Sequence, residues 1–146
     1  MYAAVSPSLP RRSFRRRRPT VLIVDDKPDI RLSYRLLLEV EGFEVLDAPN
    51  PRSALATLRD HAIDVVLVDL YMPDYGDGLG LIKAVRQHFE PAPALIAMSG
   101  AHHLGYRSSL AAAYVVGADV TLTKPVSRQT LLDAIRELRP PDPELP

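Results

Sequence analysis

Residues 20–26, which read TVLIVDD, and residues 65–69, which read VVLVD, decide the fold of this chain. Each is a short apolar run, rich in β-branched residues, that ends in an acidic side chain. Such runs are typical of strands buried in a parallel sheet. A doubly wound sheet binds its ligands in the crevice beyond the carboxyl ends of its strands. We therefore expect the carboxylates of Asp25, Asp26 and Asp69 to converge in that crevice.

The alternation of strand and helix patterns continues along the chain. Apolar runs predict strands at residues 20–25, 43–48, 64–69, 94–98 and 120–123. A helical pattern follows each run, at residues 28–41, 51–58, 79–89, 106–116 and 128–138. All strands but the second are continuous apolar runs, as expected when helices cover both faces of a sheet. Five such repeats predict an α/β domain with a doubly wound, five-stranded parallel sheet and five helices.

Capping residues and apolar stripes support these helices. Asn50 and Ser127 are good N-caps, and Gly42 and Gly117 are glycines of the kind that end helices. The positions expected to face the core are Ile30, Tyr34, Leu37, Leu38, Leu81, Ile82, Val85, Phe89, Leu131, Leu132, Ile135 and Leu138.

Composition limits the class of protein. The chain has 146 residues, of which 47% are hydrophobic and 25% charged, enough for one domain with a proper core. No stretch approaches the roughly 18 apolar residues of a membrane span. The chain has no cysteine, which excludes disulfides and thiolate metal sites and agrees with a cytoplasmic location.

The charge is unevenly distributed. The first 18 residues hold six arginines and no acid, so the remainder, with 12 basic and 18 acidic side chains, has a net charge of −6. Residues 1–19 are predicted to be a disordered arginine-rich leader, residues 20–139 the folded domain, and residues 140–146 (PPDPELP) a proline-rich tail. The leader could bind nucleic acid or an anionic membrane, fold back on the acidic body, or simply be solvated.

Polar side chains at the strand ends suit phosphoryl chemistry. Converging carboxylates repel one another unless a cation neutralises them, and their hard oxygens suit Mg²⁺ or Mn²⁺. Lys124 follows the fifth predicted strand and Ser99 the fourth. A divalent ion and an ammonium group neutralise phosphoryl oxygens, and a hydroxyl adds a directional donor. The sequence therefore indicates a site able to hold a phosphoryl group.

Each of these residues has a plainer explanation when taken alone. Asp25 or Asp26 could cap the following helix, and Asp69 could belong to a turn. Ser99 with the next glycine is a common turn pair, and Lys124 could be a solvated loop lysine. The agreement of several motifs, each at the end of a different predicted strand, favours the functional interpretation.

Together with Met72-Pro73 after Asp69, these motifs resemble the receiver domain of two-component response regulators over residues 20–138. The resemblance implies a flavodoxin-like strand order, 2-1-3-4-5. It implies that Asp69 accepts a phosphoryl group from a phosphohistidine on a histidine kinase or phosphotransfer protein. Lys124 would pair with Asp69 and then with a phosphoryl oxygen, and Ser99 would donate to another. The protein would then take part only in its own phosphorylation and dephosphorylation and would not be an enzyme with an external substrate.

The same resemblance implies a Mg²⁺ site, with Mn²⁺ as a substitute. Asp26 and Asp69 would ligate the ion directly, with the backbone carbonyl of Tyr71 as a third protein ligand. Asp25 would act through a metal-bound water.

The chain departs from the usual receiver pattern in three places. Thr121 stands where the family has a switch aromatic, three residues before the lysine, so the usual coupled rotation is in doubt. The loop at residues 75–78 is one residue longer than usual. Ser99 and Lys124 are 25 residues apart, a few more than usual, and we expect the excess within residues 101–106.

Two further features lie near this region. His102 and His103 could sense pH or bind metal, although adjacent loop histidines are more often only solvated. Tyr71 and Ala101 occupy positions that screen the acyl phosphate from water in this family. An aromatic on one side and an alanine on the other predict an intermediate lifetime.

The leading hypothesis is a stand-alone receiver that signals by phosphorylation-dependent protein binding. Its expected surface comprises the helix at 106–116, the strand at 120–123 and the last helix, with Tyr114 as a candidate contact. The alternative is a receiver-like module that binds its partner regardless of phosphorylation, as Thr121 would allow.

Two other classes are less consistent with the sequence. A DNA-binding regulator could use residues 11–18, but no recognition helix is predicted after Pro140, so only salt-dependent, non-specific affinity is expected. A haloacid-dehalogenase-like phosphatase would carry a second acid two residues after its nucleophile, where this chain has Tyr71.

Overall fold

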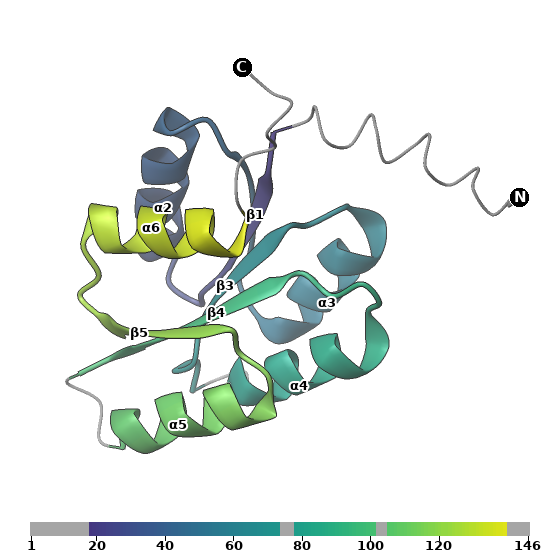
Figure 1. Ribbon diagram of the computed structural model, residues 1–146, viewed down its shortest axis with the longest axis vertical. Helices are drawn as coiled ribbons and strands as arrows, with labels where there is room; N and C mark the ends of the chain where they lie inside the picture. Colours follow the sequence, from purple (N-terminus) through teal and green to yellow (C-terminus); the bar gives the residue numbers. More distant parts are fainter. Residues whose placement is uncertain (1–17, 74–77, 102–104, 140–146) are drawn as a thin grey trace, which may run out of the picture.

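The computed structural model describes residues 18–73, 78–101 and 105–139, and within them parallel strands form one sheet in the order β2-β1-β3-β4-β5 (Figure 1). The strands are β1 (Thr20–Val24), β2 (Glu44–Ala48), β3 (Val65–Asp69), β4 (Ala94–Gly100) and β5 (Val120–Lys124). This order confirms the expected doubly wound, flavodoxin-like α/β fold. Because β1 and β3 are adjacent parallel strands, the acidic residues at their carboxyl ends are brought side by side.

Helices cover both faces of the sheet (Figure 1). On one face lie α2 (Pro28–Val40) and α6 (Arg128–Leu138), which pack on Val21 and Ile23 of β1. On the other lie α3 (Pro51–Asp60), α4 (Gly78–His88) and α5 (Tyr106–Val116), which pack on Leu22 and Val24. The alternation along β1 thus divides the core into two apolar layers, one on each face of the sheet.

The predicted capping residues are confirmed. Asn50 Oδ1 accepts a hydrogen bond of 2.8 Å from the backbone N–H of Ser53, and Ser127 Oγ accepts one of 3.0 Å from Thr130. Gly42, at φ +94°, and Gly117, at φ +132°, follow α2 and α5 in backbone conformations that side chains disfavour. These four residues explain why the helix limits could be predicted to within a few residues.

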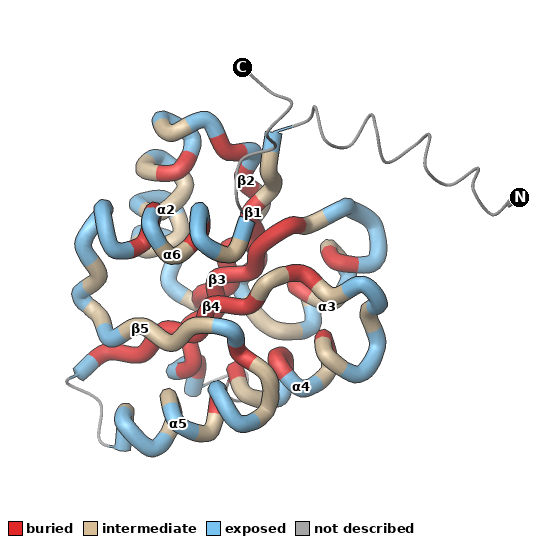
Figure 2. Tube along the Cα trace, viewed as in Figure 1, coloured by how far each residue is buried: buried red, intermediate tan, exposed pale blue. Residues whose placement is uncertain are grey.

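The expectation that β5 is covered on both faces was wrong. Figure 2 shows β1, β3 and β4 almost wholly buried, whereas Val120, Thr121 and Leu122 are half-buried and Thr123 is exposed. The reason is its place at the edge of the sheet, where only β4 is its neighbour. A second difference is that β4 continues to Gly100, so that Ser99 lies inside the strand and not after it.

No helix among the described residues is long and apolar enough to cross a membrane. Residues 1–17 and 140–146, which hold most of the predicted leader and the predicted tail, lie outside the described residues. The same is true of most of the loop at 75–78 and of His102 and His103.

Candidate functional site

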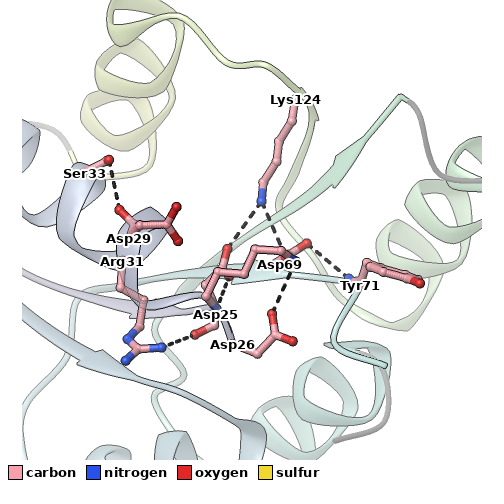
Figure 3. A network of polar contacts seen from close by, with 9 residues as sticks. Asp25, Asp26, Asp29, Arg31, Ser33, Asp69, Tyr71 and Lys124 are labelled. Carbon is pink, nitrogen blue, oxygen red and sulfur yellow. Dashed lines mark hydrogen bonds and ion pairs between the residues drawn. The ribbon is translucent and has the colours of Figure 1, made fainter. Parts of the chain in front are cut away.

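The carboxyl ends of four strands bring the predicted site residues to one edge of the sheet. Asp25 directly follows β1, Asp69 is the last residue of β3, and Lys124 is the last of β5. Ser99 lies near the end of β4 and is 2% exposed. Figure 3 shows Asp25, Asp26, Asp69 and Lys124 pointing toward one another.

Three carboxylates form a tight cluster at this edge. Asp25, Asp26 and Asp69 each offer one oxygen, and these oxygens lie within 4.8 Å of one another. Asp25 and Asp69 are 1% and 4% exposed. Asp26 Oδ1 is buried and accepts no hydrogen bond from the described residues. A buried acceptor without a donor is costly, and a hard divalent cation beside it would remove that cost. The donor set therefore fits Mg²⁺ or Mn²⁺.

Lys124 reaches this cluster from the edge of the sheet. Its Nζ lies 3.5 Å from Asp69 Oδ2, which is the pairing that the resemblance to receiver domains implied. It also lies 3.3 Å from Asp25 Oδ2, a contact between residues 99 positions apart that was not predicted (Figure 3). Lys124 thus contacts both the acid that follows β1 and the acid that ends β3.

The charges at the site do not balance. Burial raises the pKa of the Asp69 carboxyl, and the attraction of Lys124 and the hydrogen bond from the Tyr71 N–H offset only part of that effect. Burial alone would lower the pKa of Lys124, but attraction by Asp69 and Asp25 outweighs it, so that pKa is raised. The lysine faces two carboxylates, whose combined attraction outweighs its burial, whereas for Asp69 burial outweighs the attraction of the single lysine. The excess negative charge is what a divalent cation would neutralise.

Neighbouring backbone groups hold the carboxylates in place. Asp69 Oδ1 accepts a hydrogen bond of 3.1 Å from the backbone N–H of Tyr71, and Asp25 Oδ1 accepts one of 2.9 Å from Lys27. The side chain of Tyr71 is 44% exposed beside the site. Gly78, the first residue of α4, lies against the end of β3, and a Cβ there would come within 2.9 Å of the Asp69 carbonyl oxygen.

Two residues near the site were not predicted to act there. Tyr34 was expected only to face the core, and it does pack on the α2 and α6 layer. Burial raises the pKa of its hydroxyl, which also feels the charges of Lys124, Asp25 and Asp69. Arg31 donates a hydrogen bond to the Asp25 carbonyl oxygen at 2.8 Å. A signal for both existed in the sequence, since positions 31 and 34 lie on the helix that directly follows the acid pair.

Only some of the positions that depart from the receiver pattern lie among the described residues. Thr121 is half-buried on β5 and pairs in register with Ala97 of β4. Ala101 is exposed just after β4. The suggested roles of the longer loop and of the two histidines remain predictions.

Comparison with known proteins identifies a family for this arrangement. Residues 21–136 match the response regulator receiver domain. Chemotaxis protein CheY of Bacillus subtilis is 33% identical over 118 residues, covering 80% of this chain and 94% of that protein. The phosphate regulon transcriptional regulatory protein PhoB of Pseudomonas aeruginosa is 32% identical and covers 87% of this chain, which spans only 56% of PhoB.

Solved structures show the same likeness. A signal receiver domain from Bermanella marisrubri superposes with a TM-score of 0.75 at 29% identity and covers 84% of this chain and 98% of its own. A CheY-like receiver domain from Methanospirillum hungatei has a TM-score of 0.72 at 30% identity, covering 83% and 93%.

Proposed function

The chain belongs to the response regulator receiver family of two-component systems, and we propose that it accepts a phosphoryl group on Asp69 as a stand-alone regulator. Phosphorylation on an aspartate is general in this family. The observation that carries the assignment to Asp69 is its position: a buried carboxylate at the end of β3, within 3.5 Å of the Lys124 ammonium and clustered with two further acids.

The transfer would proceed by direct attack. A carboxylate oxygen of Asp69 forms a bond to the phosphorus of a phosphohistidine, the phosphorus–nitrogen bond breaks, and the imidazole of the donor leaves with the electron pair. Lys124 neutralises one phosphoryl oxygen, and Ser99 donates a hydrogen bond to another. Positioning and charge neutralisation are the main contributions a protein makes to such a transfer.

Receiver domains bind Mg²⁺ in an acidic pocket, and we assign that pocket here to Asp26, Asp69 and the Tyr71 backbone carbonyl, with Asp25 acting through water. The buried Asp26 Oδ1, which accepts no hydrogen bond from the described residues, and the excess negative charge support this assignment. When bound, the ion would supply a second positive charge for the phosphoryl oxygens.

Intact mass tests the phosphorylation. Wild type and Asp69→Asn are incubated with Mg²⁺ and acetyl phosphate, and we expect a gain of one phosphoryl group in wild type alone. No gain in a folded wild-type protein that binds Mg²⁺ would contradict the proposal and favour a phosphorylation-independent module.

Histidine kinases and phosphotransfer proteins are the donors to this family, and α2 offers a surface for one of them. Leu32, Leu36 and Val40 are 53%, 54% and 81% exposed and lie four residues apart, in an apolar stripe on one side of the helix. The stripe extends from the helix start, where the acid pair lies, so a docked helical donor would have its histidine near Asp69.

Leu36→Asp should slow transfer from a phosphorylated histidine protein and leave acetyl phosphate labelling unchanged. Equal slowing with both donors would contradict this use of the stripe.

The output surface is assigned to α5, β5 and α6. Tyr114 and Val115 on α5 are 67% and 81% exposed, and such apolar side chains suit a protein partner.

The alternative module, which binds regardless of phosphorylation, is favoured by Thr121. The two differ in hydrogen exchange: a switch changes amide protection in α5 and β5 when acetyl phosphate and Mg²⁺ are added, whereas a constitutive module does not.

We place the functional domain at residues 20–139, in accord with the family match over residues 21–136. The arginine-rich leader is assigned no role in phosphoryl transfer. Removal of residues 1–17 is expected to leave acetyl phosphate labelling unchanged.

A further inference from the structure

Arg31, near the start of α2, connects the acidic cluster with β2. Its Nη1 donates a hydrogen bond of 2.8 Å to the backbone carbonyl oxygen of Asp25, and its Nε lies 3.6 Å from Asp47 Oδ2. The side chain is only 17% exposed, so these contacts are little screened by water. In Figure 3 the guanidinium approaches Asp25 from the side opposite Lys124. Asp25 is therefore held from two sides, its carboxylate by the lysine and its backbone by the arginine.

The geometry favours the backbone contact over the ion pair. Arg31 Nε is buried and has no hydrogen-bond partner among the described residues, because Asp47 lies too far away for a hydrogen bond. A buried guanidinium with one donor unsatisfied is costly. The bond to the Asp25 carbonyl is thus the well-formed contact of this side chain.

That bond acts on the peptide that carries Asp26. A peptide group is planar, so the direction of the Asp25 carbonyl sets the plane in which the nitrogen and Cα of Asp26 lie. The backbone N–H of Asp25 is held separately, by a bond of 3.2 Å to the Ala48 carbonyl. Without Arg31 this carbonyl would lose the hydrogen bond that fixes its direction, and the backbone that carries the Asp26 carboxylate would be held less firmly.

We propose that Arg31 is a positioning residue for the divalent cation: held between Asp47 and the Asp25 carbonyl, its guanidinium orients the Asp26 carboxylate without touching the ion. This inference rests on the proposed function, in that the acidic cluster holds Mg²⁺. The positioning role predicts that removal of Arg31 changes the Mg²⁺ affinity in the direction opposite to the one expected from its charge alone. A cation near a cation site repels the ion, so removal of a mere charge would tighten binding, whereas loss of a positioning contact weakens it.

Arg35 provides a matched control one turn further along α2. Its Nη2 lies 3.6 Å from Asp47 Oδ1, and its Nη1 donates a hydrogen bond of 2.9 Å to the Val45 carbonyl. It is 29% exposed. Arg35 therefore ties α2 to β2 through the same aspartate, but its backbone acceptor lies on β2 and not in the acidic cluster.

The test is a calorimetric titration of the full chain with Mg²⁺, with thermal melting of each metal-free variant beside it. Mutation of a residue that orients a metal ligand typically weakens metal affinity about 10–100-fold. Arg31→Gln should therefore raise the Mg²⁺ Kd at least about tenfold. Arg35→Gln should leave that Kd within about twofold, although both variants lower the melting temperature. An unchanged Kd in folded Arg31→Gln, equal increases in both variants, or tighter binding would each overturn the proposal.

Arg31→Lys is the second variant, for use if Arg31→Gln does not fold. An ammonium keeps the charge but cannot span both acceptors as the guanidinium does, so its Kd should still exceed that of wild type. A Kd equal to that of wild type would refute the positioning role. Failure of wild type to bind Mg²⁺ would remove the metal assignment itself, whereas wild-type binding with an unaffected Arg31→Gln would refute only this inference.

Discussion

Asp69 carries a cost when it is ionised, because its burial raises the carboxyl pKa above the ordinary value of 3.8. A single lysine shared with Asp25 does not remove that cost. An acid whose pKa is higher in the folded chain than in the unfolded chain binds more protons when folded, so its ionisation lowers the free energy of unfolding. The cost is absent below the ordinary carboxyl pKa and complete above the raised one.

Asp69→Asn should therefore stabilise the metal-free protein at neutral pH. We expect a melting temperature a few degrees above that of wild type, since the neutral amide avoids the desolvation cost while Lys124 keeps Asp25 as a partner. Urea unfolding in the presence of a chelator should show the gap growing as pH rises from about 4 and levelling off above the raised pKa. A gap that shrinks with rising pH would contradict the assigned direction.

Lys27 offers a second test at a single residue. Its Nζ lies 3.8 Å from Asp26 Oδ1 and its side chain is 54% exposed, so it competes weakly with a cation for that oxygen. Exposed pairs are worth about 0.2–1 kcal/mol, so Lys27→Met should tighten Mg²⁺ binding by about two- to fivefold. Lys27→Arg, which keeps the charge, should not. Calorimetry at low and high salt measures the effect, which should disappear at high salt.

At the scale of elements, the start of α4 is fitted closely to the end of β3. A Cβ on Gly78 would lie 2.9 Å from both the Asp69 carbonyl oxygen and Val68 Cγ2, whereas one on Gly80 would have no neighbour within 4 Å. The two glycines lie in the same turn of the same helix. Of these two glycines, only Gly78 is required by backbone packing against Asp69, the proposed phosphorylation site.

Gly78→Ala and Gly80→Ala should change stability in opposite directions. Overpacking at Gly78 should lower the free energy of unfolding by about 1–3 kcal/mol, and it should also impair phosphorylation by displacing the end of β3. Gly80→Ala should raise that free energy by about 0.5–1 kcal/mol, as alanine does in a helix. Urea denaturation measures both, and a Gly78→Ala protein as stable as wild type would show that α4 can move away.

At the scale of the whole molecule, the site joins strands from the middle and the edge of the sheet. Asp25 and Asp26 follow β1 and Asp69 ends β3, two strands that are buried on both faces, and Lys124 ends the half-buried edge strand β5. A cation would bind there only in the folded chain, because Asp26 and Asp69 lie more than forty residues apart in sequence. Its binding should therefore stabilise the entire domain.

Saturating Mg²⁺ should accordingly raise the melting temperature. At about 100 times Kd the stabilisation is about 2.7 kcal/mol, which corresponds to about 5–15 °C for a domain of this size. Differential scanning calorimetry with and without a chelator measures the shift. Asp26→Asn should abolish most of it, and an equal shift in that variant would place the ion elsewhere.

The sequence by itself determined the strand–helix repeats, the helix ends and the order of the polar motifs. Patterns of this kind are local and can be read along the chain, because each involves only a few residues. Examples are the apolar run of β1, the caps Asn50 and Ser127, and the glycines that end α2 and α5. The likeness to receivers added the strand order, which the structure confirms. The roles assigned to the site residues remain predictions.

Only the tertiary structure decided which side chains meet. The contact of Lys124 with Asp25, the bond from Arg31 to the Asp25 carbonyl and the close approach of Gly78 to Asp69 depend on strand register and on how each helix lies across the sheet. The exposure of β5, which the sequence mispredicted, depends on which strand stands at the edge. No local pattern encodes these facts, because each is set by the packing of segments distant in sequence.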